Sequence, residues 1–408
     1  MKKHNVLNLS LSFINPVLGG LFSLKDLLIG RDASLTFSFC IALISVYLPV
    51  MWDTSVNFFS AYYGTYSGGL NDWLNPYVSI PSYFMFHYGI DFYFFIFLYV
   101  FFISYVWTKV VFYSTLELDV KYKFFIIFSV LFFSFTYYDF LLLTRSMLAT
   151  SVFFYYIFFV KNKSLLKGFI FFALSIYIHF FIFLFLILFL LSKFDINVKI
   201  IKVLLLFSLV VGFFLPQIIH LFSGLITGIP LVGNSIYYYI FSDTYGVQSF
   251  SLGELIKRLF VLFFVFITSF FASSYAKENS RLLVYLGCFC LIFSGFFTFF
   301  ERTFLAFSFL CPCIFAFQVP KNVKYLISFM IFVRGSMSYI PLLFFAYFVS
   351  VNGIDNVIPD KGLRNKIAAK PLYYSTPLLL DIHNNGYSDF VLLNHSVAKV
   401  APITELND

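Results

Sequence analysis

The chain is built around long apolar segments that carry almost no charge. A helix of about 20 apolar residues crosses the roughly 30 Å hydrocarbon core of a bilayer. Of the 408 residues, 61% are hydrophobic and 11% are Asp, Glu, Lys or Arg, whereas a soluble domain carries about 25% charged residues. This excludes an ordinary soluble fold, a disordered chain, a collagen-like fibre and a disulfide scaffold. The clear segments are about 33–50, 92–108, 124–143, 146–160, 203–221, 258–275, 282–300, 303–319 and 325–349.

These segments predict an all-α polytopic integral membrane protein with about nine to eleven transmembrane helices. The count depends on two further stretches, 5–24 and 168–191. The first contains several Asn residues and a Pro, so it is either a weak span or an interfacial segment. It lacks an Ala-x-Ala cleavage site, and we expect it to be retained.

Loop charge predicts the orientation of the chain. Lys and Arg gather in short clusters between the apolar segments, which is typical of cytoplasmic loops and accounts for the net charge of +8 without a nucleic-acid partner. The stretches 51–91 and 222–252 contain neither Lys nor Arg, so both are predicted to be large outer loops. This requires 168–191 to be re-entrant, as two half-helices that meet near His179.

The last part of the chain differs in composition from the rest. Residues 351–408 are rich in Pro, Asn and Asp and have no long apolar run, so they predict a polar extramembrane C-terminal tail. Residues 1–350 form the predicted polytopic transmembrane domain. Arg334 interrupts 325–349, so this stretch either crosses once or forms a hairpin, and the side of the tail is open.

Ionisable groups in or beside membrane spans cost roughly 2.5–3.5 kcal/mol on insertion scales and are therefore candidate functional residues. Each has a structural alternative: a pair at a helix boundary, a hydrogen-bonded core histidine or a marker of a junction between spans. Three of them are cationic or can become so and approach the outer face, which favours an anionic ligand such as a diphosphate. The candidates are Asp139, Arg145, His179, Glu301, Arg302 and Arg334.

The outer loops are rich in Tyr and Trp, including Tyr62 and Tyr63. Flat aromatic rings with hydroxyl groups suit sugars, although an aromatic belt at the membrane interface has the same composition. Glu117-Leu-Asp119 resembles a metal-nucleotide-sugar motif but lies in a Lys-flanked, cytoplasmic turn. Walker, dinucleotide-binding, metalloprotease and nucleophile-elbow motifs are absent, the cysteine pairs lie inside apolar runs, and we expect no metal and no cofactor.

Four groups of residues form a pattern spread over roughly residues 33–320: Asp53 before Tyr62-Tyr63, Thr144-Arg-Ser-Met-Leu-Ala149, Ile176-Tyr-Ile-His179 and Glu301-Arg302. This pattern resembles the Wzy-type O-antigen polymerases, and in particular the EpsG-like polysaccharide polymerases. Ser146 departs from the family, in which an amide residue is frequent at that position.

The resemblance implies a glycosyltransferase of the bacterial inner membrane, in a GT-C-like arrangement. It would move a growing glycan from undecaprenyl diphosphate to a lipid-linked repeat unit at the periplasmic face, beside a flippase and a chain-length regulator. His179 or Asp53 would be the base and Arg145 a diphosphate ligand. Substrate binding would fall to Arg302, Glu301, Tyr62, Tyr63 and Arg334. A lipid-linked oligosaccharide flippase or other transporter, and a membrane sugar acyltransferase, are the alternatives.

Overall fold

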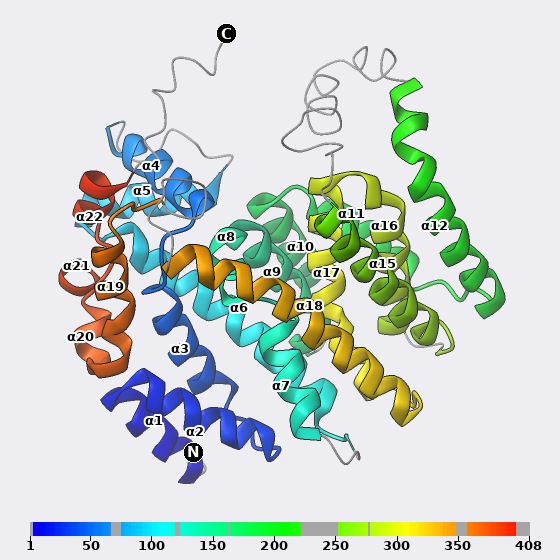
Figure 1. Cartoon of the computed structure of the whole chain (residues 1–408), viewed down its shortest axis with the longest axis horizontal. Helices are drawn as coiled ribbons and strands as arrows, with labels where there is room; N and C mark the ends of the chain where they lie inside the picture. The colour runs from blue at the N-terminus through cyan, green and yellow to red at the C-terminus, as the bar shows by residue number, and fades with distance from the viewer. Residues whose placement is uncertain are drawn as a thin grey trace. The chain divides into compact units, whose positions relative to one another are not determined.

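The computed structural model describes residues 3–66, 75–118, 123–161, 164–221, 252–275, 278–347 and 357–396, and all regular secondary structure in these ranges is helical (Figure 1). The chain divides into two compact units, each assembled from segments far apart in sequence. Unit 1 comprises Met1–Phe112, Phe135–Ile182 and Ser338–Asp408. Unit 2 comprises Tyr113–Ser134 and Phe183–Met337.

Unit 1 contains helices from the N-terminal part, the middle and the C-terminal part of the chain, including the packed pair α9 and α10. Asn15 separates the first two helices, because its side chain accepts hydrogen bonds from Val17 N and Leu18 N and so caps the second. Its helices are α1 (Lys3–Ile14), α2 (Pro16–Leu28), α3 (Ser34–Ser45), α4 (Trp52–Thr65), α5 (Pro76–Tyr88), most of α6 (Phe92–Thr115), α8 (Tyr137–Leu142), α9 (Thr144–Phe159), α10 (Leu165–Ile178), α19 (Lys361–Tyr373), α20 (Thr376–Leu380), α21 (Ile382–Asn385) and α22 (Asp389–His395).

Unit 2 is organised around helices that pack closely at glycines. A Cβ at Gly212 would lie 1.9 Å from the Leu291 carbonyl oxygen, so only glycine allows these two helices to approach this closely. Its helices are α7 (Lys123–Phe133), α11 (Ile182–Leu191), α12 (Val198–Leu221), α15 (Leu252–Ala272), α16 (Glu278–Ile292), η1 (Phe293–Gly295), α17 (Phe297–Leu310), η2 (Cys311–Ala316) and most of α18 (Lys321–Tyr347).

Among the described residues, four helices are long and apolar enough to cross a membrane: Phe92–Thr115, Val198–Ile219, Leu255–Ala272 and Thr298–Ala316. This agrees with a helical membrane protein, whereas the larger number of spans remains a prediction. The difference arises because helix breaks divide some apolar segments. Residues 124–143 form α7 and α8, and 168–191 form α10 and α11, which are separated at His179. The re-entrant course of 168–191 stays a prediction.

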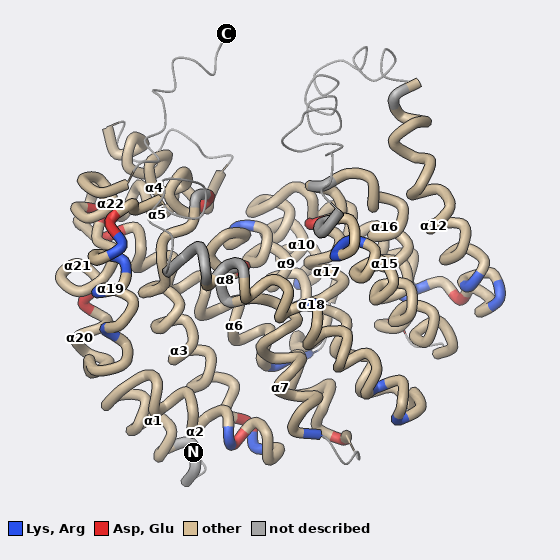
Figure 2. The backbone as a smooth tube through the Cα atoms, in the orientation of Figure 1, with Lys and Arg blue, Asp and Glu red and all other residues tan. Residues whose placement is uncertain are grey.

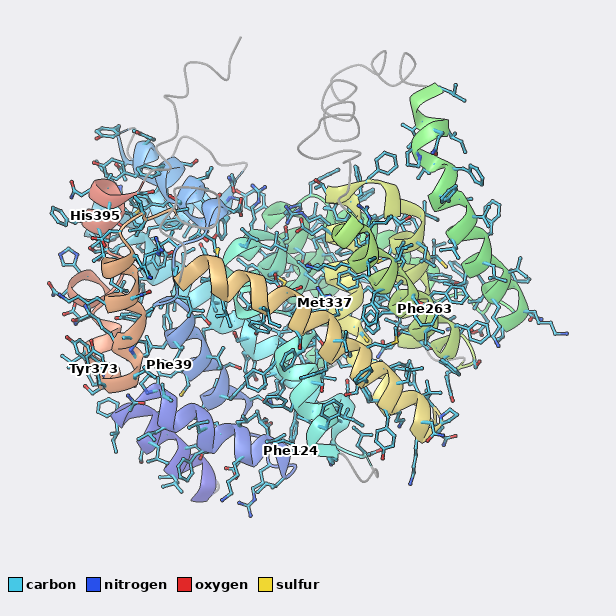
Figure 3. All side chains as sticks on the ribbon, in the orientation of Figure 1. Phe39, Phe124, Phe263, Met337, Tyr373 and His395 are labelled. Carbon is cyan, nitrogen blue, oxygen red and sulfur yellow. The ribbon has the colours of Figure 1, made fainter. Side chains whose placement is uncertain are left out.

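Large apolar side chains cover the exposed faces of the long helices. On α12, Phe213 is 73% exposed and Leu206 is 53% exposed, while Leu205 is fully buried. Phe124 on α7 and Phe263 on α15, labelled in Figure 3, are also exposed. The charged residues of α12 lie at its beginning, and the rest of the helix carries none (Figure 2). Such faces are stable in contact with lipid chains rather than water.

The described part of the predicted tail is largely helical. Residues 357–396, here called the C-terminal segment, belong to unit 1 and pack against its N-terminal helices. The sequence predicted an extramembrane tail but not these contacts. They are hydrogen bonds from Asn15 Nδ2 to the carbonyls of Pro371 (3.0 Å) and Tyr374 (2.9 Å), from Tyr47 Oη to the carbonyl of Leu379 (2.7 Å), from Thr376 to the carbonyl of Ser12, and between the hydroxyls of Ser55 and Ser396 (3.0 Å).

The N-termini of α6 and α22 cap each other. Asp389 Oδ1 accepts a hydrogen bond from Phe92 N, the first residue of α6, and Asp91 Oδ1 accepts one from Asp389 N, the first residue of α22, both at 3.0 Å. His383 Nδ1 lies 2.9 Å from the other oxygen of Asp91. Each carboxylate therefore satisfies an N–H group at the positive end of the other helix.

Candidate functional site

Asp53 lies in the first turn of α4, and its side chain is exposed. A carboxylate is favourable there because the helix N-terminus carries a partial positive charge. The Asn57 amide donates to the backbone carbonyl of Asp53 at 2.7 Å and lies 3.4 Å from Asp53 Oδ2. The neighbouring residues are fixed from both sides, since Thr54 donates to the Leu141 carbonyl and Ser55 contacts Ser396.

Arg145 is the second residue of α9. The preceding Thr144 donates to the carbonyls of Phe140 (2.7 Å) and Leu141 (2.9 Å) at the end of α8. The Leu141 carbonyl therefore accepts hydrogen bonds from both Thr54 and Thr144, which connects the start of α4 to the start of α9. Asp53 directly precedes Thr54 in the sequence, and Arg145 directly follows Thr144.

Asp139 has a local structural role. Its carboxylate accepts a hydrogen bond from Thr136 N at 2.7 Å, and the Thr136 hydroxyl accepts one from Asp139 N, which forms a capping box at the start of α8. This favours the structural interpretation of Asp139, which the sequence left open.

The charges of Asp53 and Arg145 both act on Tyr77, which lies on α5. Its side chain is 2% exposed, and burial raises the pKa of Tyr77 well above its usual value. The Thr144 hydroxyl opposes this increase, the negative charge of Asp53 adds to it, and the positive charge of Arg145 opposes it. Tyr77 is therefore a neutral phenol within reach of both charges. The sequence placed it among the aromatic residues of the outer loops and gave it no separate role, because it is one of 29 tyrosines.

His179 lies at the same end of unit 1 as Arg145. The α9–α10 pair is antiparallel, with ring contacts between Phe153 and Phe172 and between Tyr155 and Phe171. This register places His179 level with residue 147 of α9, which is about 3 Å along the axis from Arg145. Helix α5 also packs against α10.

The ring orientation of His179 has a chemical consequence. Its Nδ1 accepts a hydrogen bond from Phe181 N at 3.2 Å, so the neutral ring carries its proton on Nε2. In this arrangement His179 presents a donor rather than a proton acceptor at Nε2. It fits the recognition of an oxyanion better than the role of a base.

Tyr62 and Tyr63 lie further along α4. Tyr62 is nine residues after Asp53, which places it on the opposite face of a helix with 3.6 residues per turn. Its hydroxyl is 3.4 Å from that of Tyr66, and the negative charge of Asp389 on α22 acts on it. The structure therefore does not bring Tyr62 together with Asp53 and Arg145.

Glu301 and Arg302 lie in α17 of unit 2, and both are partly buried. Another cation lies nearby that the sequence analysis missed. Arg258 on α15 donates to the Ser294 carbonyl and stacks on Phe300, with 5.3 Å from its guanidinium carbon to the ring centroid. Arg258 closely follows loop 222–252, which was predicted to be an outer loop without cations. This position in the sequence could have identified it as a candidate.

Arg334 on α18 is held by unit 2 itself. It donates to the Ser134 carbonyl, directly after the C-terminus of α7, and stacks on Phe304 with 4.4 Å to the ring centroid. A cation is favourable at a helix C-terminus. These contacts favour a structural role for Arg334, which the sequence left as an alternative to substrate binding.

Three predicted site residues, Asp53, Arg145 and His179, thus lie at one end of unit 1, around the start of α4, the start of α9 and the end of α10. No family model, curated protein or solved structure matches this chain. No group of three or more potential metal ligands occurs among the residues that the structure describes.

Proposed function

We propose that the chain is a polysaccharide polymerase that transfers a growing glycan from undecaprenyl diphosphate to a lipid-linked repeat unit, at the periplasmic face of a bacterial inner membrane. The feature that supports this proposal most directly is the placement of a carboxylate at the start of α4, a guanidinium at the start of α9 and an imidazole donor at the end of α10, all in unit 1. Glycosyl transfer from a diphosphate requires a base for the acceptor and positive charge for the leaving group.

In the proposed reaction, an acceptor hydroxyl oxygen attacks the anomeric carbon of the donor glycan. The acceptor proton passes to the Asp53 carboxylate, the new glycosidic bond forms, and the bond from the anomeric carbon to the diphosphate oxygen breaks. Its electron pair leaves with undecaprenyl diphosphate. Asp53 is preferred as the base because it is exposed and ionisable, while His179 Nδ1 already accepts a backbone hydrogen bond.

Arg145 is the proposed ligand of the departing diphosphate. Two parallel N–H groups of a guanidinium bind phosphate oxygens, whereas a lysine offers only a point charge. The N-terminus of α9 adds its own partial positive charge beside Arg145. His179 Nε2–H would donate to another phosphate oxygen. Arg302 and Glu301 remain proposed substrate-binding residues of unit 2.

The test is elongation by the purified protein in liposomes that contain only lipid-linked repeat units. Elongated products would support a polymerase and exclude an acyltransferase, since no acyl donor is present. We expect Arg145→Lys to accumulate normally and lose most of the polymer, and Arg145→Ala to abolish it. A flippase would move the repeat units across the bilayer without joining them.

Asp139→Asn is the matched control, because an amide oxygen can still accept the hydrogen bond from Thr136 N. It should elongate normally. A normally folded Arg145→Ala protein that makes full-length polymer would eliminate the diphosphate role of Arg145. Equal losses of abundance in Arg145→Ala and Asp139→Asn would instead indicate a structural pair.

A further inference from the structure

The first two helices form a hairpin whose charged residues are confined to one end. Asn8 on α1 donates a buried hydrogen bond to Asp26 on α2 at 2.8 Å, and a Cβ at Gly19 would lie 2.2 Å from Ser12 Oγ, so the two arms are antiparallel with Asn15 at the tip. The arms have 12 and 13 residues, which is about 18–20 Å each and too short to cross a bilayer. The charged residues of the hairpin, all at its open end, are Lys3, Lys25 and Asp26.

Helix α6 gives the depth of the two segments that meet at this tip. The base of the hairpin lies near Lys109 of α6, which forms an ion pair with Asp32 in the turn between α2 and α3. The C-terminal segment is held at the other end of α6, where Asp389 accepts a hydrogen bond from Phe92 N. These two levels are about 26 Å apart along α6, close to the roughly 30 Å of hydrocarbon in a bilayer. An arm of the hairpin is shorter than this, so its tip lies between the two levels.

Backbone carbonyls at the junction of the tip and the C-terminal segment are satisfied by side chains. Pro16 has no N–H group, so the helices of the hairpin offer the Ser12 carbonyl no partner, and the Thr376 hydroxyl donates to it. Asn15 Nδ2 donates to two further carbonyls where α19 ends. Water satisfies such groups on an aqueous surface, whereas in hydrocarbon each needs a donor from the protein. The junction therefore has the hydrogen bonding that a position inside a bilayer requires.

Large apolar side chains are exposed around the same junction. Phe13 is 65% exposed at the end of α1, and Leu372 and Tyr373 are 71% and 62% exposed at the end of α19 (Figure 3). Other large apolar side chains are exposed along both arms of the hairpin. Helix α3, which packs against α2, is also exposed at Leu35 and contacts α6 through Phe39. The apolar surface thus adjoins a helix that can cross a membrane.

We propose that acyl chains of the bilayer cover this surface: the α1–α2 hairpin enters the membrane from the cytoplasmic side, and residues 371–380 enter from the outer side to meet its tip. The cations at the open end of the hairpin agree with this direction. The deep part of the C-terminal segment differs from its outer part, where His383 and Asn384 are exposed. Lys370 precedes the deep part, and its ammonium group reaches back to the Asn385 carbonyl, as a lysine at the edge of an apolar region does.

The first experiment measures the surroundings of single side chains in liposomes by electron paramagnetic resonance. Spin labels on cysteines at Phe13 and Leu372, with the five native cysteines replaced, are exposed to oxygen, which concentrates in the bilayer, and to a water-soluble nickel chelate. We expect collisions with oxygen to exceed those with the chelate by about threefold or more at both positions. Asn384 is the matched control on the same segment, and there the chelate should dominate.

Two results would overturn the proposal. If the chelate dominates at Leu372 as it does at Asn384, residues 371–380 lie in water. If the labels at Phe13 and Leu372 collide rarely with both reagents, a protein partner covers the surface in place of lipid.

The second experiment uses the unmodified chain, so it does not depend on the folding of a variant. An apolar carbene precursor that dissolves in the bilayer is activated by light, and its adducts are mapped by mass spectrometry. Residues 371–380 should be labelled, and residues 381–385 should be labelled at least about threefold less, because they lie at the aqueous edge. Equal labelling of the two stretches would contradict the proposed depth.

The direction of entry is tested with single cysteines at Lys3 and at Lys25, which both lie at the open end of the hairpin. Both should be protected from an impermeant reagent in spheroplasts and should react once the membrane is permeabilised. Reaction of one of them alone in intact spheroplasts would make 5–24 a segment that crosses the membrane. Reaction of both would reverse the direction of entry, and either result would overturn the proposal.

Discussion

Arg334, Arg258 and Arg145 lie in two different kinds of environment. Arg334 and Arg258 each donate to a backbone carbonyl near the end of a helix and stack on a ring of α17, and these two rings stack on each other with centroids 5.7 Å apart. Arg145 instead lies at a helix N-terminus, where a cation is electrostatically unfavourable. Because its position is not explained by helix stability, Arg145 is a stronger candidate for ligand binding than Arg334 or Arg258.

This contrast predicts opposite effects on stability. Arg334→Ala removes the donor to the Ser134 carbonyl and the contact with Phe304, so we expect the protein to be destabilised by about 1–3 kcal/mol. Arg145→Ala should unfold at the wild-type temperature or slightly above it. Thermal unfolding of the purified proteins in detergent measures both. If the Arg334→Ala protein had wild-type stability but no activity, Arg334 would instead bind the substrate.

Individual site residues could be predicted from the sequence where their residue type is rare in the apolar segments. Few ionisable residues lie in the apolar segments, so Arg145 and His179 could be selected directly, and the helix break at His179 was expected from loop charge. Tyr77 could be noted only as one of the outer-loop aromatics, because its burial depends on the packing of several helices. The position of Tyr62 away from Asp53 follows from helix periodicity and could have been predicted.

Among the elements, the mutual capping of α6 and α22 should depend on pH. Burial raises the pKa of Asp389 from 3.8 to about 7, Asp91 adds to this increase, and Phe92 N and His383 oppose it. The docked segment therefore binds a proton between about pH 4 and 7 that the undocked segment does not bind. Docking should therefore weaken as the pH rises from about 4 to 7 and stay at this weaker level above about pH 7.

Hydrogen exchange of the α22 amides between about pH 5.5 and 8, corrected for intrinsic rates, measures this dependence. Protection should be greater at the lower pH. Asp389→Asn should remain docked and lose the pH dependence, because its amide oxygen can still accept from Phe92 N. The same pH dependence in that variant would assign the effect to another group.

Asn15 connects two elements through different atoms. Its Oδ1 caps α2, and its Nδ2 donates to the carbonyls of Pro371 and Tyr374. We predict that Asn15→Asp keeps the cap, loses the donor and places a negative charge against these carbonyls. Hydrogen exchange should then increase in α19 and α20 but not in α2. Asn15→Ala, as the comparison, should increase exchange in both places.

Helix type was predictable from apolar composition, but helix ends were less so. The stretch 124–143 reads as one apolar run, yet Thr136 and Asp139 form a capping box inside it. The break within 5–24 likewise comes from the side chain of Asn15. The C-terminal segment has no long apolar run, and its helices are held by contacts with residues more than 300 positions away, which no local pattern could indicate.

For the whole molecule, the structure relates the C-terminal segment to the predicted outer face. Asp91 ends the stretch 51–91, and it contacts both His383 and Asp389. We therefore predict that Asn384 and Tyr66 lie on the same side of the membrane. Single cysteines at these positions, with the five native buried cysteines replaced, should both react with an impermeant reagent in spheroplasts. A cysteine at Lys321 should be protected, and protection of Asn384 alone would contradict this topology.

Unit 1 is assembled from both ends of the chain, which determines the order in which the two units can fold during synthesis. Thr376, whose hydroxyl donates to the Ser12 carbonyl, is made 364 residues later. At about 5–20 residues per second, the N-terminal helices wait roughly 20–70 s for these partners. All of unit 2 has left the ribosome's active centre by then. The unit that contains the N-terminus is therefore the last to be completed.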